Sequence, residues 1–280
     1  MSGAAGGNRI KRQDVKPTVK DYIDKVLSKY DKYVKSEITG SFYTLEKNDF
    51  GDIDLIVELN ENDKVEAKKR LVKYFNKFSN DIIIPFKSNR YFGKKALNTG
   101  EIVTILYPIK NEENSYVQID NIISLSEKET IFKQKFLNLP AIKQGLMLGL
   151  IKTIILEKPE LVEKFTIPHA LKHNQELEFN LSSSGLTLRL VTLDDNFKTL
   201  DKKDVWKTQD WNIVEYILSD FDFDQSFDNL LKDIKKKMKN KRSLKRIKGI
   251  FKSMVSVKSG EQGTLKGNEK QRALNKINNL

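Results

Sequence analysis

The sequence predicts an α+β protein in which helices flank a mixed β-sheet, followed by a second domain of helices and a β-hairpin and then by a basic C-terminal tail. Three observations predict this architecture. Up to about residue 125, apolar residues at helical spacing alternate with short strand-like apolar runs. After residue 126 the spacing is mostly helical. Between residues 231 and 258, twelve Lys or Arg residues occur with a single acid, Asp233.

The composition indicates a globular protein without disulfides. The chain has 280 residues, which suffices for one large or two small domains, and its formal net charge is +12. It has no cysteine, which excludes disulfides and thiolate metal sites and favours a cytoplasmic location. No apolar run reaches the roughly 18 residues that span a bilayer, and the N-terminal residues lack the apolar core of a secretory signal.

The first domain is predicted to cover residues 17–125. Residues 1–16 are small, polar and basic without periodicity, so we predict a disordered arm. A helix should begin at Pro17 and end at Gly40, because apolar residues recur between them every three or four positions. The remaining elements are predicted to be a hairpin of strands 42–45 and 52–59, a helix over 62–78 and strands over 81–86, 101–109 and 116–125.

The second domain is predicted to cover residues 126–230, and a basic helix with a polar tail follows over residues 231–280. The longest apolar stretch, 141–156, indicates a buried helix. A Ser-Ser-Ser-Gly run between two alternating segments indicates a hairpin turn. The further predicted elements are strands 177–181 and 186–193 and helices over 206–218 and 227–250, the last of which runs into the basic region.

Two aspartates interrupt an apolar run in the predicted strand 52–59. Asp52 and Asp54 stand two residues apart, so both side chains point to the same face of the strand, with Cα atoms roughly 6 to 7 Å apart. Carboxylates that close repel each other and lose hydration, which raises the free energy of the charged pair. A divalent cation relieves this repulsion, and oxygen ligands favour Mg²⁺ or Mn²⁺.

A third acid, Asp120, interrupts the later apolar strand V-Q-I-D-N-I on the same face as Gln118. Three acids from two neighbouring strands can hold two metal ions and so catalyse an in-line displacement at phosphorus. Gly40 and Ser41 stand shortly before the aspartate pair. A tight turn there would let backbone N–H groups approach a phosphate and would add the Ser41 hydroxyl as a donor, although the serine could equally close its own loop.

The order of these motifs resembles the DNA polymerase β-like nucleotidyltransferase superfamily. The matching residues are Gly40-Ser41 at a helix end, Asp52-Ile53-Asp54 on a strand and Asp120 on a later strand. The resemblance covers residues 17–125 and implies a nucleotidyltransferase-type sheet and the transfer of a nucleotide from an NTP such as ATP to an acceptor hydroxyl. It also implies that Asp52 and Asp54 bind both Mg²⁺ ions and that Asp120 helps to activate the acceptor. The rest of the chain broadly resembles members from phages and mobile elements.

Two other residue pairs carry weaker signals. Lys87 and Arg90 lie in a loop of the first domain, where they could contact the triphosphate or simply be solvated, and we count both as candidates for nucleotide binding. His169 and His173 have the i, i+4 spacing of a zinc site but lack its glutamate, so we do not expect them to bind a metal.

The basic stretch 231–258 has an apolar stripe at helical spacing, so one side should pack and the other should present positive charge. This pattern is typical of RNA- or DNA-binding proteins, and an anionic membrane surface is the alternative. Lysine outnumbers arginine, which favours contacts with the nucleic-acid backbone. Two functions stay open: a nucleotidyltransferase whose acceptor is a nucleic acid, a protein or a small molecule, and a nucleic-acid-binding or assembly protein that keeps the fold without turnover. The oligomeric state is not indicated.

Overall fold

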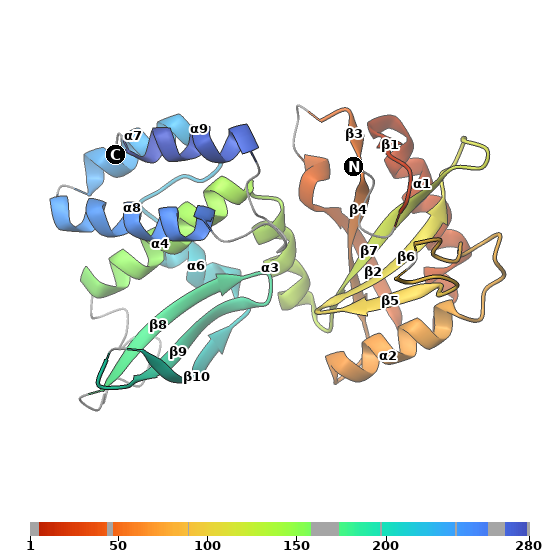
Figure 1. Ribbon diagram of the computed structural model, residues 1–280, viewed down its shortest axis with the longest axis horizontal. Coiled ribbons are helices and arrows are strands. Elements are labelled where there is room, and N and C mark those ends of the chain that lie inside the picture. Colours follow the sequence, from red (N-terminus) through yellow and green to blue (C-terminus); the bar gives the residue numbers. More distant parts are fainter. Residues whose placement is uncertain are drawn as a thin grey trace. The chain divides into compact units, whose positions relative to one another are not determined.

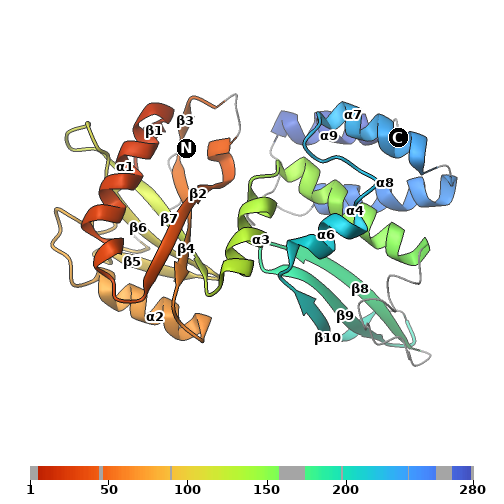
Figure 2. The same ribbon diagram turned by 180° about the vertical axis from the view of Figure 1, so that it is seen from behind.

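The computed structural model of the protein describes residues 6–43, 47–88, 90–157, 174–196, 198–238, 240–256 and 267–278. The chain is a mixed α+β protein that divides into two units, residues 1–138 and 139–280 (Figures 1 and 2). Within the described ranges, no helix is both long enough and apolar enough to cross a membrane.

A five-stranded mixed sheet forms the centre of the N-terminal unit. Its strands are β2 (Tyr33–Thr39), β4 (Asp52–Leu59), β5 (Ala96–Thr99), β6 (Ile102–Pro108) and β7 (Tyr116–Ser124). They lie in the order β2-β4-β7-β6-β5 (Figure 1). The neighbours β4 and β7 run parallel, and all other neighbours run antiparallel. Three predicted strands are thereby confirmed as β4, β6 and β7.

Helices α1 (Arg12–Lys25) and α2 (Lys64–Phe75) cover one face of this sheet (Figure 2). Side chains alternate along β4, so Ile53 and Leu55 point toward these helices and are buried in the main hydrophobic core. The helix predicted over 62–78 is confirmed as α2. The alternation leaves the intervening residues of β4 on the opposite face of the sheet.

The opposite face is covered in part by α3 (Glu127–Leu137), which contacts β2, β4 and β7. Phe132 on this helix and Ile122 on the sheet are both buried. Because the apolar part of this face needs a helix to cover it, the N-terminal unit extends to Asn138. The strand pattern alone places the boundary earlier, at residue 125, where the last strand of the sheet ends.

The helix predicted from Pro17 to Gly40 is wrong in its second half. It ends at Lys25, and residues 33–39 form β2 instead. Apolar residues continue the helical spacing beyond the end of α1. Antiparallel pairing with β4 satisfies the backbone of residues 33–39, however, and this long-range pairing decides the outcome.

The N-terminal arm is ordered where the structure describes it, although the composition of residues 1–16 predicts disorder. Strand β1 (Ile10–Lys11) pairs antiparallel with β3 (Asp49–Phe50), and α1 follows directly at Arg12. Residues about forty positions away along the chain order this segment by pairing with it. The local composition of residues 1–16 does not predict this pairing.

Two other predicted strands differ from the structure. Residues 42 and 43 of the predicted strand 42–45 belong instead to a 3₁₀ helix, Gly40–Tyr43, and residues 44 and 45 lie outside the described ranges. The predicted strand 81–86 forms only an isolated bridge at Ile84. Its neighbour Pro85 has no N–H group to donate to a ladder, which explains why the pairing stops there.

The C-terminal unit combines helices with a three-stranded antiparallel sheet. Its elements are α4 (Ala141–Glu157), β8 (Gln175–Ser182), β9 (Gly185–Leu193), β10 (Thr199–Thr208), α6 (Trp211–Ile217), α7 (Phe227–Lys237), α8 (Lys241–Ser256) and α9 (Gly267–Asn278). The predicted hairpin is confirmed as β8 and β9. The start of the predicted helix 206–218 belongs to β10, and the predicted helix 227–250 is divided into α7 and α8. His169 and His173 lie outside the described residues.

Candidate active site

The three predicted carboxylates lie on one face of the sheet, on the parallel neighbours β4 and β7. The register pairs Asp54 with Asp120 and Asp52 with Gln118, so all four side chains point to the same side. This face is the one opposite α1 and α2. The structure therefore brings together the acids that the sequence singles out, and we call Asp52, Asp54 and Asp120 the carboxylate cluster.

Burial and mutual repulsion disfavour charge in the carboxylate cluster. Burial is the main cause that raises the pKa of Asp54 well above its usual range, and the charges of Asp52 and Asp120 raise it further. Burial also raises the pKa of Asp120 to about 6, with a smaller contribution from Asp52 in the same direction. In the described part of the chain, no Lys or Arg forms an ion pair with any of the three acids.

Two neutral side chains hold Asp120, and sequence reasoning missed both. The Thr104 hydroxyl donates to Asp120 Oδ1 (2.6 Å), and Gln118 Nε2 donates to Oδ1 and Oδ2 (3.0 and 2.9 Å). Both hydrogen bonds oppose the rise of the pKa of Asp120. A signal for Gln118 existed, since it is a polar residue two positions before Asp120 in an apolar strand. Thr104 gives no signal, because threonine is common in strands.

The backbone conformation at residue 40 and the nearby side chain of Asp54 both require a glycine there. It lies at the end of β2 with a φ of +70°, a conformation that side chains disfavour. A Cβ atom built on Gly40 would lie 2.3 Å from Oδ2 of Asp54, which is far inside van der Waals contact. The predicted Gly-Ser turn and the carboxylate cluster are therefore adjacent. The glycine is required because the turn and the carboxylate share this space.

Ser41 and Lys47 stand in the loop that connects this turn to Asp52. Ser41 is partly buried, and its hydroxyl has no hydrogen-bond partner among the residues that the structure describes. Lys47 is exposed, and its charge acts on Asp54 in the direction that lowers the pKa of that acid. The hydroxyl could therefore donate to a ligand. Lys47 is a further cation near the cluster that the sequence pattern does not single out.

Carboxylate oxygens are the donors that Mg²⁺ and Mn²⁺ prefer, so the chemistry of the cluster fits such an ion. Burial, with a smaller effect of neighbouring acids, raises the pKa of Asp54 and of Asp120, so a bound cation would favour their charged forms. As the side chains stand, no three Asp, Glu, His or Cys residues of the described ranges form a group that could hold a metal ion. Both oxygens of Asp120 accept hydrogen bonds from Gln118, so an ion would have to displace that contact.

The two basic residues predicted to bind nucleotide each lie over a tyrosine ring. Its Nζ lies 5.2 Å from the ring centroid of Tyr116, which stands two positions before Gln118 on the same face of β7. Arg90 is exposed, and its guanidinium lies 5.3 Å from the ring centroid of Tyr91. Tyr91 and Tyr116 pack against the same small cluster of Phe86 and Leu106, so the contacts favour neither basic residue over the other.

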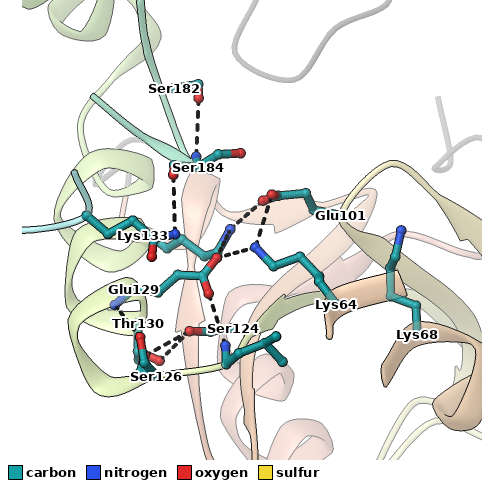
Figure 3. Close-up of polar contacts among 12 residues, drawn as sticks. Lys64, Lys68, Glu101, Ser124, Ser126, Glu129, Thr130, Lys133, Ser182 and Ser184 are labelled. Atoms are coloured by element: carbon teal, nitrogen blue, oxygen red, sulfur yellow. Dashed lines mark hydrogen bonds and ion pairs between the residues drawn. The ribbon is translucent and has the colours of Figure 1, made fainter. Parts of the chain in front are cut away.

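A second buried group of charges occurs beyond the opposite end of β7 (Figure 3). It comprises Lys64, Glu101, Glu129 and Lys133, which we call the paired cluster. Lys133 is fully buried and forms ion pairs with Glu101 and with Glu129, the latter at 3.3 Å. Lys64 pairs with the same two glutamates, at 3.1 Å from Glu101. This group joins the start of α2 to α3, and each positive charge in it has an acidic partner.

The exposed face of α8 is the second candidate functional surface. Its exposed cations are Lys241, Arg242, Lys245, Arg246 and Lys252. Among the described residues none of them forms an ion pair, and α8 itself contains no acid. On α7, by contrast, Lys237 pairs with Asp233 (2.8 Å). A Cβ built on Gly249 would meet nothing within 4 Å, so this face of the helix is open. The basic stretch predicted over 231–258 thus covers both α7 and α8, and α8 is the helix of the two without an acid.

No protein-family model matches the chain, and no curated protein matches it significantly. The function must therefore be argued from the residues themselves.

Proposed function

We propose that the protein is a nucleotidyltransferase, with a nucleotidyltransferase-type fold in its N-terminal unit. It would transfer a nucleoside monophosphate from an NTP to an acceptor hydroxyl and release pyrophosphate. The observation that carries this proposal is the carboxylate cluster. Three acids on neighbouring parallel strands share one face, none of them forms an ion pair with a described residue, and Gly40 packs against one of them. Such uncompensated charge costs stability and is typical of functional sites.

In this reaction the acceptor oxygen bonds to the α-phosphorus while the bond to the β-phosphate oxygen breaks, and pyrophosphate leaves with those electrons. Asp52, Asp54 and Asp120 would hold Mg²⁺ or Mn²⁺, which neutralises charge on the phosphates and on the attacking and leaving oxygens. Asp120 would accept the proton of the acceptor hydroxyl. Gln118 would have to release Asp120 for this step.

The residues around the cluster supply donors for the triphosphate. Gly40, the first residue of the 3₁₀ turn, stands beside Asp54, and the Ser41 hydroxyl and the backbone N–H groups of this turn could donate to phosphate oxygens. Lys87, whose ammonium lies over the ring of Tyr116 at the start of β7, would add a positive charge. The acids and these donors would then hold the phosphates from two sides, which orients the α-phosphorus for in-line attack.

A transfer assay tests the proposal. The protein is incubated with each α-labelled NTP, Mg²⁺ or Mn²⁺, and pooled RNA, DNA, protein and small-molecule acceptors. We expect label transfer that falls by at least about 100-fold in Asp52→Ala and Asp54→Ala, since two-metal sites fail without a ligand. Asp49→Ala, an exposed aspartate in the same loop, is the matched control and should keep activity. Transfer that persists in Asp54→Ala would exclude this mechanism.

The face of α8 favours a second candidate function, which is nucleic-acid binding without turnover. Five exposed cations on one helix face, with no ion pair among the described residues, suit a polyanion such as a nucleic-acid backbone better than a single small anion. The same surface also suits an enzyme whose acceptor is a nucleic acid. Binding and transfer are therefore measured separately.

Gly249 offers a clean test of that surface. Gly249→Glu places one negative charge amid the cations, and Gly249→Gln is its neutral match with the same side-chain length. We expect Gly249→Glu to weaken RNA or DNA binding about tenfold at low salt and to reduce the salt dependence, while Gly249→Gln has little effect. Equal binding by both variants would show that α8 does not contact nucleic acid.

A further inference from the structure

The N-terminal residues 7–12 run along the end of the sheet where the carboxylate cluster lies. Gly7 packs directly on β7, because a Cβ atom there would come within 2.7 Å of the Gln118 amide nitrogen. The Asn8 amide donates to Tyr116 O (2.7 Å), and the Tyr116 amide donates to Asn8 Oδ1 (3.2 Å). These contacts fix the segment to the strand that carries Asp120.

Within this segment, Arg12 binds the loop between the Gly-Ser turn and Asp52. Its Nη1 donates to Phe42 O (3.0 Å) and its Nε donates to Lys47 O (2.8 Å), on either side of residues 44–46. Its amide donates to Asn48 O (2.8 Å). Arg12 thus joins the two ends of this loop, because the carbonyl of Phe42 lies five positions before that of Lys47 and six before that of Asn48.

The rings of two phenylalanines hold the same guanidinium. The Arg12 Cζ atom lies 5.2 Å from the ring centroid of Phe42 and 5.2 Å from that of Phe50. A planar guanidinium can stack on rings and donate in two directions at once, whereas a lysine ammonium is a single point charge that cannot do both. The site is therefore specific for arginine.

We propose that Arg12 is a positioning residue of the candidate active site. By tying Phe42 and Lys47 together, it holds the turn at Gly40 and Ser41 against Asp54, where the turn would receive the triphosphate. Arg12 acts through the loop and need not touch the substrate. The contacts of Arg12 suffice to order the loop. Its effect on NTP binding rests on the proposed nucleotidyl transfer.

Hydrogen exchange of the ligand-free protein tests the loop order. We compare the wild type with Arg12→Ala and Arg12→Lys, and Arg9→Ala is the comparison variant because Arg9 also binds the loop, at Asp49 O (3.2 Å) and Asp49 Oδ1 (2.6 Å), but through exposed contacts and without stacking on Phe42 and Phe50. Loss of a charge-assisted hydrogen bond should accelerate exchange of the amides of residues 40–43 and 47–51 by about tenfold or more in Arg12→Ala, and by less in Arg12→Lys. The amides of α2 should not change.

Unchanged exchange in the loop, or an equal rise throughout the N-terminal unit, would overturn the proposal. If Arg12→Ala does not fold, Arg12→Lys decides the question by the same comparison. Arg9→Ala should accelerate loop exchange less than Arg12→Ala, because the contacts of Arg9 with Asp49 are exposed. A loop response of Arg9→Ala as large as that of Arg12→Ala would assign the effect to the whole segment and overturn the role of Arg12.

Transfer kinetics then test the link to NTP binding. We expect the KM for NTP to rise about tenfold in Arg12→Ala, with a smaller change of kcat, because the turn that receives the triphosphate is no longer held. Arg12→Lys should recover part of this loss. A normal KM in a variant whose loop exchanges faster would refute the link. A wild type without any transfer would refute the proposed function, while the exchange experiment would still decide the role of Arg12.

Discussion

The N-terminal unit buries charge at two places along β7, and only one of them balances it. In the paired cluster, burial opposes the charged form of Glu129, but Lys133 and Lys64 outweigh this effect and lower the pKa of Glu129. In the carboxylate cluster, burial and neighbouring acids act together and raise the pKa of Asp54. The two sites lie in one unit and have opposite electrostatics.

The difference separates a structural role from a functional one. Lys133 cannot leave water without an acid, and its partners join α3 to the start of α2, so this cluster serves the fold. The carboxylate cluster joins no elements through ion pairs among the described residues, and it costs stability when charged. A sequence that keeps such acids gains something other than stability from them.

Removal of Lys133 should have the largest effect on folding. Lys133→Met would leave the buried Glu129 with Lys64 as its remaining basic partner among the described residues, and breaking a buried ion pair costs about 3 to 5 kcal/mol of the free energy of unfolding. Lys135→Met is the matched control, since Lys135 is exposed on the same helix, and it should change stability by no more than about 0.5 kcal/mol. Urea unfolding followed by circular dichroism measures both. Equal stability of the two variants would show that the paired cluster is not structural.

Added Mg²⁺ should act on the carboxylate cluster alone. If the acids bind the ion in the native state, Mg²⁺ at a hundredfold excess over its Kd stabilises the protein by about 2.7 kcal/mol relative to EDTA. Asp54→Asn should lose this gain, and Lys135→Met should keep it. Thermal unfolding with and without Mg²⁺ gives the comparison. A gain that survives in Asp54→Asn would place the ion elsewhere on the protein.

Without a divalent ion, Asp54→Asn should stabilise the protein. The substitution keeps the shape of the side chain and removes a charge that burial, Asp52 and Asp120 all disfavour, so we expect a higher free energy of unfolding at neutral pH. Asp49→Asn, at an exposed position that pairs with Arg9, should give no gain. Both are measured in EDTA. A less stable Asp54→Asn would mean that the charge of Asp54 is compensated after all.

The carboxylates could be predicted from the sequence because they break a strong local pattern. A charge in an apolar run is conspicuous, and the period of two along a strand places Asp52 and Asp54 on one side without knowledge of the fold. The same reasoning places Asp120 on the side of Gln118. The register between β4 and β7 then brings the two strands' acids together. Catalysis at this site stays a prediction.

Features that depend on distant partners could not be predicted. Residues 33–39 continue the spacing of α1, and only pairing with β4 makes them a strand. Arg12 stands in a polar arm, and its partners Phe42 and Lys47 are thirty or more positions away. Neither the strand pairing nor the contacts of Arg12 can be predicted from a window of local sequence, because tertiary contacts supply the energy that stabilises them.

The smallest predicted change in stability concerns Asp21 on α1, a carboxylate that has basic partners, unlike the acids of the carboxylate cluster. Asp21 accepts hydrogen bonds from the Lys110 ammonium and the Tyr107 hydroxyl (both 2.9 Å) and pairs with Lys25 (3.0 Å). Burial opposes its charge, but these partners lower the pKa of Asp21 to about 2. Because an unfolded aspartate has a pKa near 3.9, the stabilisation is present above about pH 4 and is lost as the pH falls toward 2.

Asp21→Asn should therefore lower the free energy of unfolding by about 1 kcal/mol at pH 6, since the site is near the surface and partly screened. The difference from the wild type should shrink as the pH falls from 4 toward 2. Asp24→Asn, one turn away on an exposed part of the same helix, should show no such trend. Urea unfolding between pH 3 and 6 measures all three proteins. A loss that does not depend on pH would mean that Asp21 stabilises α1 through its shape and not through its charge.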